Sequence, residues 1–278
     1  MLIRLYQIGI EPFLVWESVS FPERKIGMRV LLSNDDGIRA EGIRALAKVF
    51  CRKHDVVLCA PMHEQSGMAH ALNVHRRLEV ARCGDIEALY PVEAWTIDGT
   101  PTDCVKIYLD FMAEDVRPDL VISGINHGAN LATDVLYSGT VGAAMEGYLH
   151  DVPSVAISLD RHSEIPFEQV AEIAAEYLER TMAEREAPFF LNLNFPKVFA
   201  PEGPRFVFSQ LGKRDYLNAF QKVTDEDGRT YFTVAGDIVD LDKGEATDIY
   251  AVESGFISVT PLHADLTDYV MLDAQLRK

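Results

Sequence analysis

The sequence is short of positive charge and of long apolar runs, and both shortages narrow what the chain can be. Its 278 residues carry 43 acidic and 26 basic side chains, a formal net charge of −17. Such a surface repels the phosphates of DNA and RNA, so we expect no nucleic acid polymer as a partner. No stretch approaches the roughly 20 apolar residues of a membrane span, so we expect no membrane partner either. A small phosphate substrate is compatible with this charge if a metal ion supplies positive charge locally.

Cysteine is also scarce. The four residues show neither a CxxC spacing nor a zinc pattern: Cys51, Cys59, Cys83 and Cys104. Reduced, scattered thiols in a cytoplasmic protein are the simplest interpretation. The GxGxxG and GxxxxGK[ST] fingerprints are absent, which disfavours a dinucleotide-binding dehydrogenase and a P-loop NTPase.

Residues 1–27 lack the basic start, long apolar block and small-residue cleavage site of a signal peptide. We interpret them as an N-terminal extension upstream of a functional start at Met28. An arm that packs on the core is the alternative.

From residue 28 the chain alternates between buried-strand patterns and amphipathic helical patterns. The expected strands are 30–32, 55–60, 119–122, 154–158 and 189–193, and the expected helices are 40–50, 101–112, 141–149 and a segment through 170–178. Strands joined by helices through short links predict an α/β fold with a mostly parallel sheet. A β-hairpin excursion is expected between residues 71 and 97.

Past about residue 200 the pattern becomes β-rich, with strand-like runs at 206–208, 231–234 and 257–260. We therefore predict a single domain over 28–278. It consists of an α/β core at 28–200 and a β-rich C-terminal extension at 201–278, which we interpret as an arm for subunit contacts.

The first strand breaks abruptly into Asn34, Asp35, Asp36 and Gly37. Two adjacent carboxylates repel each other unless a cation lies between them, and Mg²⁺ or Mn²⁺ suits oxygen ligands. Gly37 lets the chain turn tightly. Taken alone, the tetrapeptide favours an Asx-rich turn that caps the next helix over a metal site.

Two more strand ends carry oxygen-rich or glycine-rich loops, at 64–67 and 123–128. Ligands of an open parallel sheet bind at the carboxyl ends of its strands, so we expect these loops to converge. Asp35, Asp36, the hydroxyl of Ser66 and the amide oxygen of Asn126 would then offer oxygen ligands to one divalent cation. Ser66 alone is more often a turn residue, and Asn126 alone more often bonds to backbone.

Ser138, Gly139 and Thr140 directly precede a helix, where hydroxyls and backbone N–H groups can hold a phosphate. N-capping is the simpler role of either hydroxyl alone. His127 is a candidate general acid, or else a solvated loop histidine. Asp103 is assigned to capping of its own helix.

Seven segments follow one family's order: RVLLSNDDGIRAEGI (29–43), EQSG (64–67), IDGTPTDCV (97–105), DLVISGINHGANLATDVLYSGTVGAAMEG (119–147), VPSVAIS (152–158), LNLNFP (191–196) and TDIYAVESGFISVTPL (247–262). On these segments the chain resembles the SurE 5′-nucleotidases, also called stationary-phase survival protein E. The resemblance implies a Rossmann-like three-layer core and a C-terminal extension exchanged between subunits of a homodimer or homotetramer. It also implies metal-dependent hydrolysis of nucleoside 5′-monophosphates, extended in some members to 3′-nucleotides and polyphosphate.

The resemblance further implies roles for single residues. The metal ligands are Asp35, Asp36, Ser66 and Asn126, and the phosphate-binding residues are Asn34, Gly67, Ser138, Gly139 and Thr140. One of the two aspartates takes the proton of the attacking water, or an aspartate is itself the nucleophile; the sequence leaves both routes open. Two departures from the family pattern are the extension 1–27 and the segment Met68–Leu72, where relatives often carry small hydroxyl residues, so base preference stays open. The rival functions are a broad phosphatase or exopolyphosphatase and a non-enzymatic nucleotide sensor.

Overall fold

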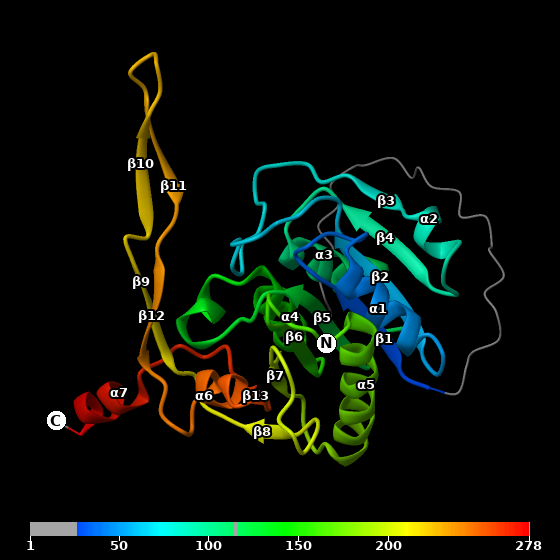
Figure 1. The fold of residues 1–278 in the computed structure, drawn as a ribbon. Coiled ribbons are helices and arrows are strands. Elements are labelled where there is room, and N and C mark those ends of the chain that lie inside the picture. The colour runs from blue at the N-terminus through cyan, green and yellow to red at the C-terminus, as the bar shows by residue number, and fades with distance from the viewer. Residues whose placement is uncertain (1–26, 114–115, 278) are drawn as a thin grey trace.

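A nine-stranded sheet forms the centre of the computed structural model, which describes residues 27–113 and 116–277 (Figure 1). From one edge to the other its strands are β3 (Val80–Arg82), β4 (Glu93–Ile97), β2 (Asp55–Pro61), β1 (Arg29–Ser33), β5 (Leu120–His127), β6 (Ser154–Leu159), β7 (Phe190–Phe195), β13 (Ile257–Pro261) and β8 (Phe206–Phe208). Residues 1–26 of the predicted extension lie outside the described residues.

The six strands from β4 to β7 are parallel, and this confirms the predicted α/β class. β3 runs antiparallel to β4, and β13 antiparallel to β7 with β8 parallel to β13. β1 lies between β2 and β5. The chain therefore first adds strands on the β2 side of β1 and later adds strands on the β5 side. Such a switch in strand order leaves a crevice at the carboxyl ends of the two central strands.

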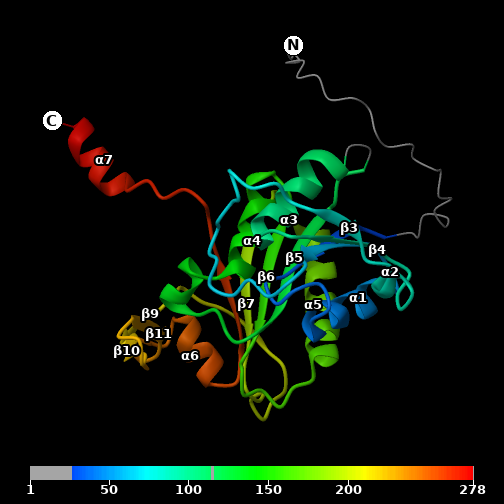
Figure 2. The same cartoon turned by 90° about the horizontal axis from the view of Figure 1, so that it is seen from above.

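Helices cover both faces of the sheet, as Figure 2 shows from above. α1 (Glu41–Phe50) and α5 (Phe167–Glu184) pack on one face, and α3 (Pro101–Ile107) and α4 (Gly139–Leu149) pack on the other. Within β1, Val30 and Leu32 join the core under α1 while Leu31 joins the core under α3. This alternation follows from the two-residue period of a strand, and burial on both faces explains the continuous apolar run.

α3 begins as its sequence predicts. The Thr100 hydroxyl accepts from the backbone N–H of Asp103, while the Asp103 carboxylate accepts from the backbone N–H of Thr100, which forms a capping box in front of Pro101. The helix ends earlier than expected, at Ile107, and continues as a π-helical turn through Met112.

Two expectations need correction. β5 continues to His127, so the segment 123–127, expected as a loop, is the end of a strand. The hairpin expected at 71–97 is confined to β3 and β4, with a short helix α2 (Gly84–Glu87) between them. Residues 68–79 form no strand, and side chains at the start of α3 bind their backbone instead of a neighbouring strand. The Thr100 hydroxyl donates to the carbonyl oxygen of Ala71, and the Asp103 carboxylate accepts from the backbone N–H of Asn73.

The chain after residue 200 divides between the sheet and a projecting arm. The arm consists of the strands β9 (Lys213–Leu217), β10 (Phe220–Thr224), β11 (Thr230–Val234) and β12 (Asp237–Asp242), paired as β9 with β12 and β10 with β11. It rises away from the core in Figure 1, whereas α7 (Tyr269–Leu276), which buries no residue, projects to the side of the core. α6 (Asp248–Glu253) packs beside β13. Among the described residues, no helix combines the length and apolar character needed to cross a membrane.

Candidate active site

The two adjacent aspartates follow β1 at the switch point of the sheet. Asp35 is only 5% exposed, and the adjoining Asp36 is half-buried. Burial, together with the neighbouring charge of Asp36, raises the pKa of Asp35 to about 6, although hydrogen bonds from Thr140 act to lower it. Burial also raises the pKa of Asp36. The fold therefore concentrates negative charge that its own described side chains do not neutralise.

The loop that follows β2 is tied directly to this aspartate turn. The backbone N–H of Gln65 donates to the carbonyl oxygen of Asp35 at 2.7 Å. Ser66 and Gly67 are exposed, and the Ser66 hydroxyl donates to Oε1 of Glu64 at 2.7 Å. Ser66 thus arrives beside the aspartates through a backbone hydrogen bond, as the convergence of strand ends predicts.

Asn126 reaches the same place from the neighbouring strand. The register between β5 and β6 shifts between Gly124 and Asn126, and such an irregularity re-aims the side chains next to it. The amide nitrogen of Asn126 donates to the carbonyl oxygen of Gly128 at 2.7 Å, which turns the amide oxygen away from that contact. The next residue along, His127, donates its backbone N–H to Oδ2 of Asp36 at 3.3 Å.

The N-terminus of α4 points at Asp35. Ser138 is the N-cap and accepts from the backbone N–H of Val141. The Thr140 hydroxyl donates to Oδ1 of Asp35 at 2.6 Å. A Cβ at Gly139 would lie 2.9 Å from the Cβ of Asp35, so only glycine permits this approach. The positive end of the helix therefore faces the acidic turn, where it favours an anion.

These elements enclose a pocket of about 610 Å³, a size typical of small-ligand sites. Seven of the predicted candidates line it: Asp35, Asp36, Ser66, Gly67, Asn126, His127 and Ser138. The other three lie beneath its surface. Gly139 and Thr140 are buried against Asp35, and fully buried Asn34 donates its amide to the carbonyl oxygen of Gly37, so it shapes the turn.

The donor set suits one hard divalent cation. No group of three or more His, Cys, Asp and Glu side chains in the described ranges is placed to hold a metal, so the two aspartates would need other oxygen ligands. The hydroxyl of Ser66 and the amide oxygen of Asn126 line the same pocket. A cation there would favour the charged form of both carboxylates and so offset the effect of their burial on the pKa.

Sequence reasoning missed several residues of the pocket wall: Glu64, Asp134, Tyr137, Arg161 and Tyr216. Arg161 follows β6 by two residues, so the strand-end rule that found Asn126 would also have found it. Tyr216 comes from the arm, and its hydroxyl donates to Asp134 at 2.7 Å. No local pattern indicates a contact between residues 82 positions apart.

A buried carboxylate next to the site also went unnoticed. Glu146 of α4 is 3% exposed and accepts from Nε2 of His70 at 2.7 Å and from Nζ of Lys106 at 3.1 Å. The same loop is joined to the helix by the backbone N–H of Ala69, which donates to the carbonyl oxygen of Tyr137. The loop that carries Ser66 is thus fastened to α4 a few residues beyond Ser66.

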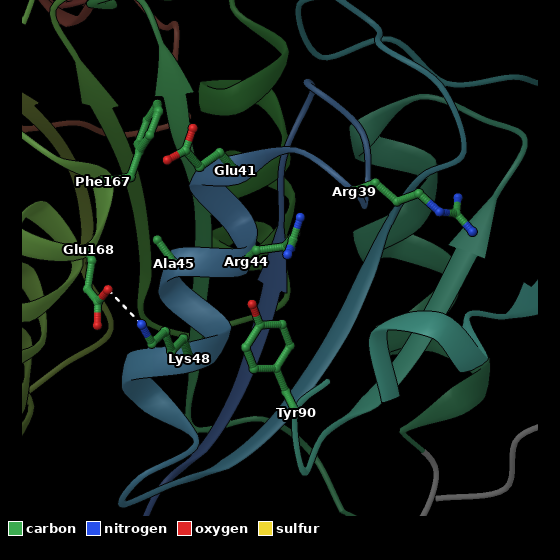
Figure 3. A pocket seen from close by; sticks show the side chains of 8 residues that line it. All are labelled: Arg39, Glu41, Arg44, Ala45, Lys48, Tyr90, Phe167 and Glu168. Carbon is green, nitrogen blue, oxygen red and sulfur yellow. Dashed lines mark hydrogen bonds and ion pairs between the residues drawn. The ribbon is translucent and has the colours of Figure 1, made fainter. Parts of the chain in front are cut away.

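A second pocket, of about 400 Å³, lies on the outer side of α1 (Figure 3). The ion pair of Lys48 with Glu168, at 2.7 Å, crosses it, and Arg44 points into the space above Tyr90. None of the predicted site residues lines this pocket. It holds no pair of adjacent aspartates, and its carboxylate Glu168 is already paired with Lys48, so it does not compete as the active site.

Comparisons with known proteins agree with this geometry. A profile of the family described as survival protein SurE matches residues 30–218. The 5′-nucleotidase SurE of Heliobacterium modesticaldum is 44% identical over 246 residues, covering 88% of this chain and 89% of that protein. The 5′-nucleotidase SurE of Synechococcus sp. (strain JA-3-3Ab) is 40% identical over 255 residues, 90% of this chain and 97% of its own. The crystal structure of the SurE protein from Aquifex aeolicus superposes with a TM-score of 0.75 at 34% identity, covering 90% of this chain and all of that one.

Proposed function

This chain belongs to the SurE family, and from that premise we propose that it is a metal-dependent phosphoric monoester hydrolase that acts on nucleoside 5′-monophosphates. One observation carries the proposal. Side chains from three strand ends, Asp35 and Asp36, Ser66, and Asn126, line one pocket together with the N-cap of α4. Oxygen ligands for a cation thus stand beside a helix end that favours an anion.

Each group has a task in this proposal. Asp35, Asp36, Ser66 and Asn126 hold one Mg²⁺ or Mn²⁺, which, when bound, neutralises charge on the phosphoryl group and acidifies nearby water. The N-terminus of α4, with Ser138 in the pocket wall, orients the phosphate for in-line attack.

A carboxylate of the aspartate pair accepts the proton of the attacking water. Asp36 suits this role because it is the less buried of the two. Thr140 holds Asp35 in place from below.

The test is phosphate release from a panel of nucleoside 5′- and 3′-monophosphates and polyphosphate, with EDTA, Mg²⁺ or Mn²⁺. We expect release only with a metal and fastest from 5′-monophosphates. Faster release from polyphosphate would make the chain an exopolyphosphatase. Tight nucleotide binding without turnover under any metal would favour a sensor and contradict the proposal.

Two variants localise the activity. Asp35→Asn should keep the fold and nearly abolish turnover, because it removes a carboxylate from the cation site. Asp85→Asn is the matched control, since Asp85 is an exposed carboxylate that pairs with Arg39 outside the pocket. Near-normal turnover in Asp35→Asn would refute the assignment.

We also propose that the arm joins two copies of the chain in a cytoplasmic homodimer or homotetramer. Its strands expose apolar side chains that a partner would cover: Leu217, Phe220, Val223, Phe232, Val234 and Ile238. The scattered, buried cysteines suit a reducing compartment. Light scattering after size exclusion tests the assembly, and a monomer at micromolar concentration would contradict it.

A further inference from the structure

The pocket of the candidate active site is strongly unbalanced in charge. Four carboxylates line it, from Asp35, Asp36, Glu64 and Asp134, against one guanidinium, from Arg161. Asp134 is already paired, with Arg214 at 3.0 Å. The remaining three carboxylates and a dianionic phosphate would crowd together there, so any fixed positive charge in this wall bears on substrate binding.

Arg161 lies close to the predicted metal ligands. A point placed as a Cβ on Gly128 would be 3.8 Å from Nε and Nη2 of Arg161 and also 3.8 Å from Nδ2 of Asn126. The guanidinium nitrogens of Arg161 and the amide nitrogen of Asn126 therefore lie on the same side of Gly128, no further apart than about twice 3.8 Å. The charge of Arg161 also lowers the pKa of Asp36, against the larger opposing effect of burial.

The backbone of Arg161 is anchored, while its guanidinium is not. The carbonyl oxygen of Arg161 accepts from Nε2 of His127 at 3.2 Å, and the His127 ring contacts Phe167 edge-on with centroids 6.1 Å apart. Within residues 27–113 and 116–277, the guanidinium makes neither an ion pair nor a hydrogen bond. An exposed guanidinium with free donors next to a phosphate pocket matches the bidentate geometry of phosphoryl oxygens.

We propose that Arg161 is a substrate-binding residue that donates to a phosphoryl oxygen of the nucleotide. It lies on the connection from β6 to α5, which covers the sheet face opposite α4. The phosphate is then held by the N-terminus of α4 from one side of the sheet end and by Arg161 from the other. This inference rests on the proposed phosphomonoesterase function and adds to it a residue that recognises the phosphate.

The test compares Arg161→Ala, Arg161→Lys and the control Arg44→Ala under saturating Mn²⁺. Arg44 is also exposed and without an ion pair in the described part of the chain, but it lines the pocket on α1. We expect kcat/KM for a nucleoside 5′-monophosphate to fall about 10- to 100-fold in Arg161→Ala and less in Arg161→Lys, as on loss of one charged donor. Arg44→Ala should stay within twofold of the unmodified protein.

Two readouts separate binding of substrate from a merely structural role. Added guanidinium ion should restore part of the activity of Arg161→Ala. The Mn²⁺ concentration that gives half-maximal rate should not rise, because the loss of the positive charge of Arg161 cannot weaken the binding of a positively charged metal ion. Activity of Arg161→Ala within twofold of the unmodified protein at saturating Mn²⁺, or a rise in the Mn²⁺ concentration that gives half-maximal rate, would overturn the inference. An inactive unmodified protein would instead count against the proposed function itself.

Discussion

Replacing Gly142 by alanine tests whether the contact between α4 and the loop behind Ser66 sets the geometry of the site. A Cβ on Gly142 would lie 2.8 Å from the carbonyl carbon of Ala69 and nearer still to its oxygen. Ordinary contacts begin near 3.4 Å, so helix and loop must part by at least 0.6 Å. Because the opposing atoms are backbone, no side-chain rotation relieves the contact.

The substitution should affect stability only slightly and activity strongly. Alanine is better than glycine inside a helix by about 1 kcal/mol, whereas overpacking costs about 1–3 kcal/mol, so the free energy of unfolding should fall by no more than about 2 kcal/mol. Displacement of a positioned group by about 1 Å costs about 100-fold in rate, so we expect kcat/KM to fall about 10- to 100-fold. The expected variant is therefore folded but poorly active.

Urea denaturation and phosphate release at increasing Mn²⁺ give both quantities. Gly84→Ala in α2 is the matched control, because a Cβ there meets nothing within 4 Å. Wild-type kcat/KM in Gly142→Ala at every metal concentration would show that the loop tolerates the shift, and the reasoning about its position would fail.

Three further predictions concern groups around the pocket. Thr140→Val removes the 2.6 Å hydrogen bond to Asp35 and should lower kcat by about tenfold in the phosphate-release assay, while a rate within twofold would contradict that role. Burial raises the pKa of Glu146, but hydrogen bonds from His70 and Lys106 lower it more, so the folded value lies below the ordinary 4.5. Such a carboxylate stabilises the fold above pH 4.5 and loses this effect as the pH falls through its folded pKa. In urea titrations, Glu146→Gln should therefore lower the free energy of unfolding at pH 7 and lower it less at pH 4. An equal loss at both pH values would refute this expectation. Arg214→Met strands the carboxylates of Asp134 and Asp240 and should cost about 3 kcal/mol of unfolding free energy by the same method, unless the arm is uncoupled from the core, in which case no shift appears.

Local pattern was sufficient for the features that depend on neighbouring residues in the chain. The apolar run at Val30–Leu32 predicts a strand buried on both faces, and the structure confirms it. The Thr100–Pro101–Asp103 signature predicts the start of α3, because a cap involves only residues three apart. The meeting of strand ends at Asp35 and Asn126 follows from the topology of parallel sheets.

Long-range contacts were beyond the same reasoning. Asn126 is re-aimed by an irregularity between β5 and β6, which depends on the partner strand. Tyr216 reaches Asp134 from the arm, and Glu146 meets His70 across 76 positions. The roles of the metal and phosphate ligands come from the family resemblance and stay predictions, because proximity in a pocket does not reveal which oxygen binds what.

The position of β13 between β7 and β8 has a consequence for synthesis of the chain on the ribosome. The candidate metal ligands are complete by residue 126, yet β7 gains its outer neighbour only when Ile257–Pro261 has emerged. Until then the outer edge of β7, a strand that is fully buried in the finished fold, is unpaired, and such edges recruit other chains. Productive folding therefore has to wait until β13 has emerged, and a nascent chain halted between β8 and β13 would carry an assembled candidate crevice on an aggregation-prone sheet.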